Sequence, residues 1–418
     1  MDPIALVFVF LLLVFNFWNL YNVPIILAGV GSLLQGDKKR KKKSYAAGKL
    51  PKVSIVVPVK NEEKVVGRLL EALMKLRYPS EKMEVIVVDD DSEDRTQEIC
   101  KSFCAKYPQV RLLAKQDSTT KASALNYGVK HVNGEVVATF DADSVPEPDS
   151  LLNAVEFFED PKVAAVQGRI CSINADESML TKFLYYEGFV QYDGYIRGKD
   201  QLGLFVSLAG TCQFIRRSVL EEMGGWKDES LSEDVELSLR LTAKDYEIRY
   251  APDVRTWEES PRGIRDLVNQ RARWYRGNVE LGFKFGTLLK KLSWRRFDAE
   301  MTLFGTYIIV ACIVCYFMAF WSFLLPMDLF TIIMRLTSFC IIVILACAGV
   351  ALTCITRPLK MRNLLWLPFI YGYWGFQSFI ALYAITQVIL RRPRKWTKTS
   401  RSGYVTEDAK KTLRVINP

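Results

Sequence analysis

The sequence has very little histidine: His131 is the only one among 418 residues. A metal centre built on imidazole ligands is therefore excluded. Cysteine is present nine times, but five of the nine lie in long apolar stretches, namely Cys312, Cys315, Cys340, Cys347 and Cys354. Such cysteines behave as small hydrophobic residues. The sequence therefore predicts neither a disulfide framework nor a cysteine-based metal site.

Charged residues are nearly absent from four long stretches, which are Ile4 to Leu34, Met301 to Leu325, Leu329 to Ile355 and Asn363 to Leu390. Each is long enough to cross a hydrocarbon core of roughly 30 Å, for which about 20 helical residues suffice. The first stretch also lacks the basic start and the small-residue cleavage site of a secretory signal. We interpret it as a retained membrane anchor.

The formal net charge is +10, and the basic residues gather beside the apolar stretches, in "DKKRKKK" (37–43), "KKLSWRR" (290–296) and "RRPRK" (391–395). Contact with anionic membrane lipids explains this distribution. No nucleic-acid recognition motif accompanies the charge, so nucleic acid is not an expected partner. The positive-inside bias places residues 50 to 300 in the cytosol of a multi-pass protein of the cytoplasmic membrane.

Residues 51 to 140 alternate between strand and helix patterns. Apolar, β-branched runs predict strands over 52–59, 83–91, 110–115 and 135–140, and helical spacing predicts helices over 62–76 and 95–107. This alternation is typical of βαβ units in an α/β fold with a mostly parallel sheet. Ligands of such sheets bind at the carboxyl ends of the strands.

Polar motifs follow three of these predicted strands: "KNEE" after the first, "DDDSED" after the second and "DADS" after the fourth. The last places Asp141 and Asp143 on one turn, which suits a hard divalent cation that also contacts phosphate oxygens. Acidic turns are also common on solvated surfaces, so this motif gains its meaning from the others. About ninety residues later, "SEDVELSLRL" opens an amphipathic helix with Asp234, and "QRARW" (270–274) follows.

Together these motifs resemble the family 2 glycosyltransferases. The resemblance covers nearly the whole chain through "VPVKNEE", "VVDDDSEDRT", "KASALN", "DADS", "GTCQFIRRSVLEEMGGW", "SEDVELSLRL", "QRARW" and "WTKTSRSG". The membrane-integrated branch, with cellulose, hyaluronan, chitin and poly-N-acetylglucosamine synthases, is the most similar. The resemblance implies a nucleotide-sugar-binding domain of the GT-A type joined to interfacial and transmembrane helices. Two residues depart from the family pattern: Lys60 stands where many members have a tyrosine, and Asp91 replaces a glycine.

The resemblance also implies roles for particular residues. Mg²⁺ or Mn²⁺ would be held by Asp143 and Asp141, and Asp234 would be the base that deprotonates the acceptor. The nucleotide sugar, expected to be a UDP-sugar, would be contacted by Glu62, Asp90, Lys121 and Arg273. The acceptor would be contacted by Gly210, Thr211, Gln270 and Trp274, and the gating segment would include Trp396, Thr397 and Lys398. One displacement at the anomeric carbon would invert its configuration.

The segment around "QRARW" has two interpretations. As part of an amphipathic helix over 263–285, its tryptophan and arginines would anchor the chain among lipid headgroups. By resemblance, Arg273 would contact the diphosphate, and the ring of Trp274 would form a platform along which a glycan slides. An interfacial helix that carries the motif satisfies both interpretations.

We expect a membrane anchor over 1–36, a basic cytosolic linker over 37–50 and a catalytic domain over 51–260. Interfacial helices over 261–300, a membrane region over 301–390 and a cytosolic tail over 391–418 would follow. Three crossings after the catalytic domain would place the tail outside, so one apolar stretch is expected to turn back, with the break at Pro368, Gly372 and Gly375.

A processive β-polysaccharide synthase is the favoured function. A transferase that adds one sugar to a ceramide or polyprenyl-phosphate lipid and an inactive membrane scaffold are the alternatives.

Overall fold

The computed structural model describes residues 3–35, 50–116, 120–286, 288–324, 367–394 and 399–406, with short pieces between 328 and 365. These residues form two compact units. The first contains residues 1–36, 189–203 and 268–395, and the second contains residues 37–188, 204–267 and 396–418.

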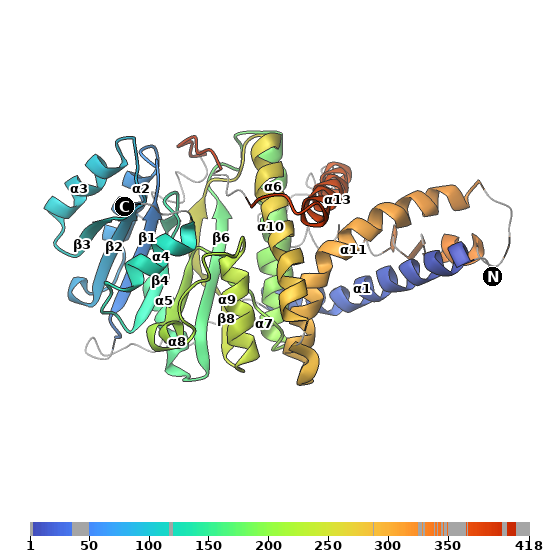
Figure 1. Cartoon of the computed structure of the whole chain (residues 1–418), viewed down its shortest axis with the longest axis horizontal. Coiled ribbons are helices and arrows are strands. Elements are labelled where there is room, and N and C mark those ends of the chain that lie inside the picture. The colour runs from blue at the N-terminus through green and yellow to red at the C-terminus, as the bar shows by residue number, and fades with distance from the viewer. Residues whose placement is uncertain are drawn as a thin grey trace. The chain divides into compact units, whose positions relative to one another are not determined.

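The second unit is built on an eight-stranded sheet with the strand order β3-β2-β1-β4-β7-β6-β8-β5 (Figure 1). Its strands are β1 (Val53–Val59), β2 (Met83–Asp89), β3 (Val110–Ala114), β4 (Val136–Thr139), β5 (Val145–Pro146), β6 (Val163–Ser172), β7 (Gln213–Arg216) and β8 (Glu247–Glu258). Its helices are α2 (Val66–Met74), α3 (Thr96–Lys106), α4 (Lys121–Val129), α5 (Ser150–Val155), α6 (Met179–Phe189), α8 (Arg217–Glu222) and α9 (Glu233–Ala243). The strands and helices predicted over residues 52–140 are confirmed.

The sheet is mixed, and its parallel strand pairs outnumber the antiparallel ones, in agreement with the mostly parallel sheet that the sequence predicts. The β1 strand runs parallel to β2 and β4, but β7 runs antiparallel to both β4 and β6. The turn that precedes β7 therefore lies at the edge of the sheet where β4 ends, because Gln213 at the start of β7 pairs with Thr139. The register also places the ends of β1 and β2 at this edge, with Val59 opposite Asp89.

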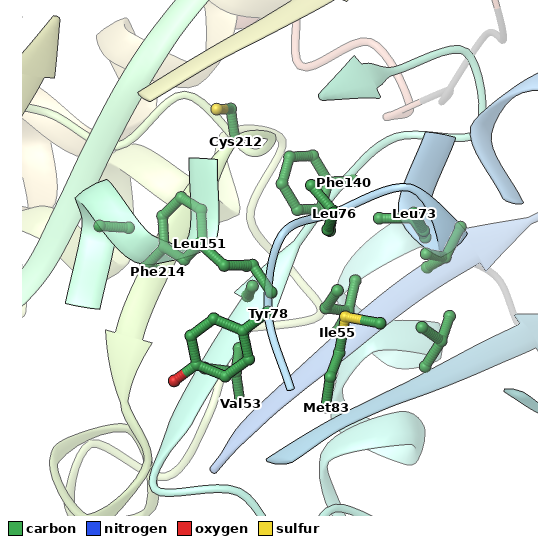
Figure 2. Packing of buried hydrophobic residues seen from close by; sticks show 14 of the residues in the cluster. Val53, Ile55, Leu73, Leu76, Tyr78, Met83, Phe140, Leu151, Cys212 and Phe214 are labelled. Carbon is green, nitrogen blue, oxygen red and sulfur yellow. The ribbon is translucent and has the colours of Figure 1, made fainter. Parts of the chain in front are cut away.

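The core of this unit lies between the sheet and the helices that cover it. Alternating apolar residues make β1 and β2 almost fully buried, and Val53, Ile55 and Met83 pack with residues of α2 and the turn after it (Figure 2). The rings of Phe140 and Phe214 meet edge to face, with centroids 5.9 Å apart. Each such side chain contributes about 1.5–3 kcal/mol when fully buried. The core thereby fixes the strand ends that carry the polar motifs.

The first unit has three long helices, α1 (Pro3–Leu34), α11 (Trp294–Ser322) and α13 (Leu367–Ile389), among its described residues. It also has the short helices η4 (Val190–Ile196), α7 (Arg197–Gln201) and η5 (Leu288–Lys290). Most of α10 (Ile264–Phe285) also belongs to it. Figure 1 shows α1 and α11 running side by side. Two segments in the described part of the chain, Asn16–Leu34 and Trp294–Cys315, are long and apolar enough to cross a membrane.

Small residues and one buried ion pair join the helices of this unit. A Cβ atom at Gly198 would lie 1.8 Å from the carbonyl oxygen of Ile25, so α1 and α7 touch backbone to backbone. Asp298 of α11 pairs with Lys199 at 3.0 Å and accepts a hydrogen bond from Tyr21 at 2.7 Å. Such close contacts and shared polar groups are typical of helices packed within a membrane.

The expected break in the last apolar stretch is not found. Residues Leu367–Ile389 form one continuous helix, α13. Pro368 is the second residue of this helix. The N–H groups of the first turn make no hydrogen bond within the helix, so a proline there breaks none. The glycines Gly372 and Gly375 lie within the helix, and a Cβ atom at either would meet no other atom within 4 Å. The expected linker over 37–50 lies outside the described residues except for Leu50, as does most of the stretch from 329 to 355.

Candidate active site

The turn after β4 supplies the two carboxylates that the sequence assigns to a metal. Asp143 is 2% exposed, and it accepts a hydrogen bond of 2.9 Å from the backbone N–H of Glu259. The guanidinium of Arg401 lies 3.2 Å from the other carboxylate oxygen of Asp143. Burial raises the pKa of Asp143, and the charge of Arg401 opposes this rise. Asp141, two residues earlier, is more exposed and pairs with Lys121.

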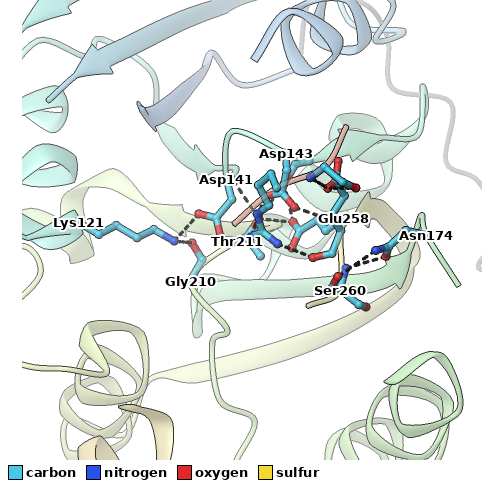
Figure 3. A network of polar contacts seen from close by, with 12 residues as sticks. Lys121, Asp141, Asp143, Asn174, Gly210, Thr211, Glu258 and Ser260 are labelled. Carbon is cyan, nitrogen blue, oxygen red and sulfur yellow. Dashed lines mark hydrogen bonds and ion pairs between the residues drawn. The ribbon is translucent and has the colours of Figure 1, made fainter. Parts of the chain in front are cut away.

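Lys121 is placed by the start of α4, where Thr120 caps the helix by accepting a hydrogen bond of 3.1 Å from the backbone N–H of Ser123. Its ammonium group contacts Asp141 and donates a hydrogen bond of 3.0 Å to the carbonyl oxygen of Gly210. Burial alone would lower the pKa of Lys121, but the negative charges of Asp141, Glu233 and Asp234 together outweigh it and the pKa rises. Lys121 is therefore a permanently charged link between α4, the β4 turn and the turn before β7 (Figure 3).

Gly210 brings Asp234 into this group. Its φ is +77°, and a Cβ atom there would lie 3.2 Å from a carboxylate oxygen of Asp234 and 3.3 Å from the Lys121 ammonium. Asp234 is in the first turn of α9, and its other oxygen accepts a hydrogen bond of 2.8 Å from the N–H of Val235. The structure therefore brings together Lys121, Asp141, Gly210 and Asp234, which are far apart in the sequence.

Thr211 connects this group to a buried glutamate that sequence reasoning missed. Thr211 accepts a hydrogen bond of 3.1 Å from the N–H of Asp141 and donates one of 2.6 Å to Glu258, the last residue of β8. Ser144 donates to the same Glu258 oxygen at 2.5 Å. Burial, together with the charges of Asp143 and Asp141, raises the pKa of Glu258 to about 8. Glu258 thus carries a proton near neutral pH.

The loops after β1 and β2 form the region to which the sequence assigns the nucleotide. Lys60 lies 3.7 Å from Asp90, and the second carboxylate oxygen of Asp90 is buried without a hydrogen-bond partner among the described residues. The backbone N–H of Glu62 donates to Thr96 at 2.7 Å, which ties the two loops together. Asp91 has a φ of 59°, the conformation that glycine favours, so the replacement of glycine preserves a left-handed turn.

Comparison with known proteins shows the family of this chain. A family model described as "Glycosyltransferase like family 2" matches residues 51–277. The chain belongs to this family. It is 34% identical over 289 residues to the probable glycosyltransferase YdaM of Bacillus subtilis, with 68% of this chain and 69% of that protein covered. The chain is therefore a glycosyltransferase.

Other relatives act on different acceptors. The beta-monoglucosyldiacylglycerol synthase of Trichormus variabilis is 35% identical over 248 residues, which cover 58% of this chain and 52% of that protein. The poly-beta-1,6-N-acetyl-D-glucosamine synthase of Staphylococcus epidermidis is 32% identical over 231 residues, which cover 55% of each chain. This glycosyltransferase thus matches about half the length of these two proteins.

A solved structure shows the same fold. The mannosyltransferase PcManGT of Pyrobaculum calidifontis, in complex with GDP-Man and Mn²⁺, is similar with a TM-score of 0.59 at 20% identity. The alignment covers 90% of this chain and 100% of the mannosyltransferase chain. The catalytic unit of this glycosyltransferase therefore has the GT-A type of fold that the sequence predicts.

The residues present fit a divalent cation bound together with a diphosphate. Asp141 and Asp143 offer hard oxygen ligands, and Arg401 already holds a positive charge against Asp143. No cluster of three or more acidic, histidine or cysteine side chains suited to a metal occurs among the described residues. Mg²⁺ and similar ions are commonly bound by one or two carboxylates, with phosphate oxygens and water completing the shell. The diphosphate of the donor would supply those oxygens.

The "QRARW" residues lie on α10, in the first unit. The spacing of Gln270, Arg273 and Trp274 places them on one helix face. Trp274 is 38% exposed, and the guanidinium of Arg271 lies 4.4 Å from the centre of its ring. The roles of these residues stay predictions. Trp396, Thr397 and Lys398, the predicted gating residues, lie outside the described residues.

Three further residues of the site were not singled out from the sequence: Arg68, Glu259 and Arg401. Arg68 of α2 lies 3.0 Å from Glu259, and Arg401 contacts both Asp143 and the backbone oxygen of Glu259. The acid pair in "WEES" (257–260) was the signal available for Glu259. For Arg401, the only signal was its place in "WTKTSRSG".

Proposed function

We propose that this glycosyltransferase is an inverting membrane enzyme that takes a sugar from a nucleotide donor, a UDP-sugar, and extends a β-linked polysaccharide. The observation that carries the proposal is the convergence of Lys121, Asp141, Gly210 and Asp234 beside the buried Asp143. This convergence supports a role for Asp234 as the base, close to a turn that would bind the cation. Both are needed to transfer a glycosyl group from a diphosphate.

The base is Asp234. The acceptor hydroxyl attacks the anomeric carbon and passes its proton to the Asp234 carboxylate, while the bond between that carbon and the diphosphate oxygen breaks. The bonding electrons leave with the nucleotide diphosphate. A single displacement of this kind inverts the anomeric centre, so an α-linked donor gives a β-linked product. Lys121 pairs with Asp141, and the negative charge of Asp234 also stabilises the charged form of Lys121.

The leaving group requires positive charge. A divalent cation held by Asp141 and Asp143 would act as a Lewis acid on the diphosphate oxygens. Arg273 is proposed to add a planar cationic group to the same charge. Glu62 and Asp90 are proposed to contact the base and ribose of the nucleotide. The buried oxygen of Asp90 that has no partner among the described residues supports this role, because a ribose hydroxyl would satisfy it.

Acceptor contacts are proposed for Gly210, Thr211, Gln270 and Trp274. Processive extension rests chiefly on Trp274, because an aromatic face binds the C–H surface of a sugar without demanding one register. Its exposed fraction of 38% supports this role. Since Arg271 lies over the ring, only the opposite face would be offered to a glycan.

The membrane placement is proposed from the apolar helices and the flanking charge. The segments Asn16–Leu34 and Trp294–Cys315 would cross the membrane, and the catalytic unit and the tail would lie in the cytosol. With Trp294–Cys315 as a crossing, a cytosolic tail requires one more crossing, so either α13 or the stretch from 329 to 355 would cross, but not both. Protection of the tail from protease in sealed inside-out vesicles would contradict a cytosolic tail.

The deciding experiment is product sizing with the purified full chain. We would supply radiolabelled UDP-glucose, UDP-N-acetylglucosamine and GDP-mannose with Mg²⁺ or Mn²⁺, and separate polymer, lipid and free sugar. A β-linked polymer that Asp234→Asn fails to make is the expected result. Transfer of one sugar to a lipid would establish the second candidate, which the similarity to beta-monoglucosyldiacylglycerol synthase favours. No transfer from any donor would refute both.

A further inference from the structure

The segment 399–406 near the C-terminus lies across the proposed donor site. Ser400 contacts Asp266, and the backbone N–H of Thr406 donates a hydrogen bond of 3.0 Å to the carbonyl oxygen of Ile173. Val405 packs against Val145 and Ile173. All these residues belong to the second unit. The segment is therefore held at both ends by contacts that do not involve the acidic site.

Between these two ends, Glu259 fixes the middle of the segment. Its carboxylate accepts hydrogen bonds from the backbone N–H groups of Ser402 at 2.8 Å and Gly403 at 3.1 Å. Arg68 lies 3.0 Å from the same carboxylate and balances its charge. Gly403 has a φ of +76°, so the chain turns sharply at the point where it meets Glu259. Glu259 is only 5% exposed, and water competes little for these bonds.

The backbone of Glu259 extends the connection to the metal-binding turn. Its N–H donates to Asp143 at 2.9 Å, and its carbonyl oxygen accepts a hydrogen bond from Arg401. Glu259 therefore contacts Asp143, Arg401 and the two residues that follow Arg401. This connection places the guanidinium of Arg401 3.2 Å from Asp143, with only 16% of its side chain exposed.

Arg401 occupies the place beside Asp143 that a divalent cation requires. A guanidinium and a metal ion cannot both approach one buried carboxylate oxygen closely, because their charges repel and their volumes overlap. A metal ion that arrives without nucleotide must therefore displace Arg401 from Asp143, and the displaced guanidinium then keeps only its weaker attraction to carboxylates such as Asp141 and Glu62. A nucleotide diphosphate adds a further partner for the displaced Arg401, because guanidinium groups bind phosphate oxygens well.

We propose that Glu259 is a positioning residue that docks segment 399–406 on the donor site, where Arg401 and the divalent cation compete for Asp143. Metal and nucleotide then bind with positive coupling, because the diphosphate receives the displaced Arg401. The coupling is reciprocal, so metal also tightens nucleotide binding. This inference rests on the proposed function, since it takes Asp141 and Asp143 as the metal-binding carboxylates.

Metal binding without nucleotide tests the competition. We would measure Mn²⁺ binding to the detergent-solubilised full chain by electron paramagnetic resonance. Arg401→Gln should bind Mn²⁺ about ten-fold more tightly than the parent, because an adjacent positive charge changes the cation affinity of a carboxylate by at least that factor. Arg401→Lys keeps the charge and should stay near the parent. Asp266→Ala removes a different contact of the same segment, the hydrogen bond from Ser400, and should leave the affinity unchanged.

The same samples test the coupling. UDP should tighten Mn²⁺ binding strongly in the parent and much less in Arg401→Gln, because no competitor remains to be displaced. If Arg401→Gln bound Mn²⁺ no more tightly than the parent, or if UDP tightened Mn²⁺ binding equally in both, the competition would be refuted. A segment with a merely structural role would give that result.

Hydrogen exchange tests the role of Glu259 without metal. In Glu259→Gln the amide can replace only part of the hydrogen bonding of a carboxylate, so peptides covering 399–406 should exchange about ten-fold faster. Peptides from β1 and β2 should exchange as in the parent. Unchanged exchange in 399–406 would refute the docking role. If β1 and β2 also exchanged faster, the variant would be misfolded, and the Arg401→Gln measurements would decide the proposal.

Neither measurement requires sugar transfer. A chain that transfers no sugar from any donor but gives the expected Mn²⁺ and exchange results would refute the proposed function and support the docking and the competition. Conversely, normal transfer with no effect of Arg401→Gln on Mn²⁺ binding would refute only this inference. Asp143→Asn should abolish Mn²⁺ binding in both the parent and the Arg401→Gln background.

Discussion

Gly210 is the position where one added methyl group most directly tests the candidate site. In Gly210→Ala, the new Cβ would lie 3.2 Å from an oxygen of Asp234 and 3.3 Å from the Lys121 ammonium, so one or both must move by a few tenths of an ångström. Its φ of +77° adds strain, which costs about 1–2 kcal/mol for a residue with a Cβ. Two separate effects are therefore expected: a small loss of stability and a displaced base.

Gly224 offers a matched control, because an alanine there would add the backbone strain without displacing a catalytic group. Gly224 has a φ of +70°, and a Cβ atom at that position would meet nothing within 4 Å. Gly224→Ala should thus lose the same stability as Gly210→Ala but keep its catalytic geometry. Displacement of a catalytic group by about 1 Å can cost roughly 10²-fold in rate, so the smaller shift at Gly210 should cost about ten- to hundred-fold.

The assay compares thermal unfolding midpoints and initial transfer rates for the parent and both variants, with the donor that product sizing identifies. We expect similar midpoints for the two variants and a much lower rate for Gly210→Ala alone. If Gly210→Ala transferred sugar at the parental rate, the group formed by Lys121, Asp141 and Asp234 would not be the reaction centre. Equal loss of rate in both variants would show that backbone strain, and not the contact with Asp234, limits activity.

Three further predictions follow from the site. Asp234→Asn should abolish transfer and leave the affinity for UDP within a few-fold of the parent. Asp143→Asn should instead weaken metal-dependent UDP binding. Equal losses of UDP binding in titrations of the two variants would show that the two roles are misassigned. Trp274→Ala should lose about 1–2 kcal/mol of acceptor binding, still release some free sugar and make little elongated product. Trp274→Phe should make part of the parent's elongated product. Full-length product from Trp274→Ala at the parental rate would show that the tryptophan is a membrane anchor. Glu258 has a pKa of about 8 in the folded chain against an ordinary 4.5, so folding takes up a proton between these values and the free energy of unfolding falls as pH rises through that window. Glu258→Gln does not titrate, so its melting temperature should rise relative to the parent between about pH 5 and pH 8; parallel pH profiles for the two proteins would contradict a proton on Glu258.

The sequence by itself determined the parts of the molecule whose signals are local. Residues 52–140 alternate between β-branched runs and helical spacing, and the structure has strands and helices there because side-chain periodicity decides which faces are buried. The carboxylates of "DADS" and "SED" were identified by their motifs, each within a few residues. The long uncharged stretches predicted α1, α11 and α13, because spanning a hydrocarbon core is a matter of length and polarity.

Only the tertiary structure decided how distant segments meet. The antiparallel direction of β7 places Gly210 and Thr211 beside the β4 turn. Strand direction depends on the path of the chain over the 68 residues between Asp141 and Gly210, and it has no local signature. Arg401 reaches Asp143 across more than half of the sequence, and Glu259 holds both through its backbone as well as its carboxylate. Backbone contacts do not depend on side-chain identity, so no residue pattern predicts them. The burial of Glu258 also depends on the tertiary structure, and it raises the pKa of this carboxyl, which accepts hydrogen bonds from Ser144 and Thr211.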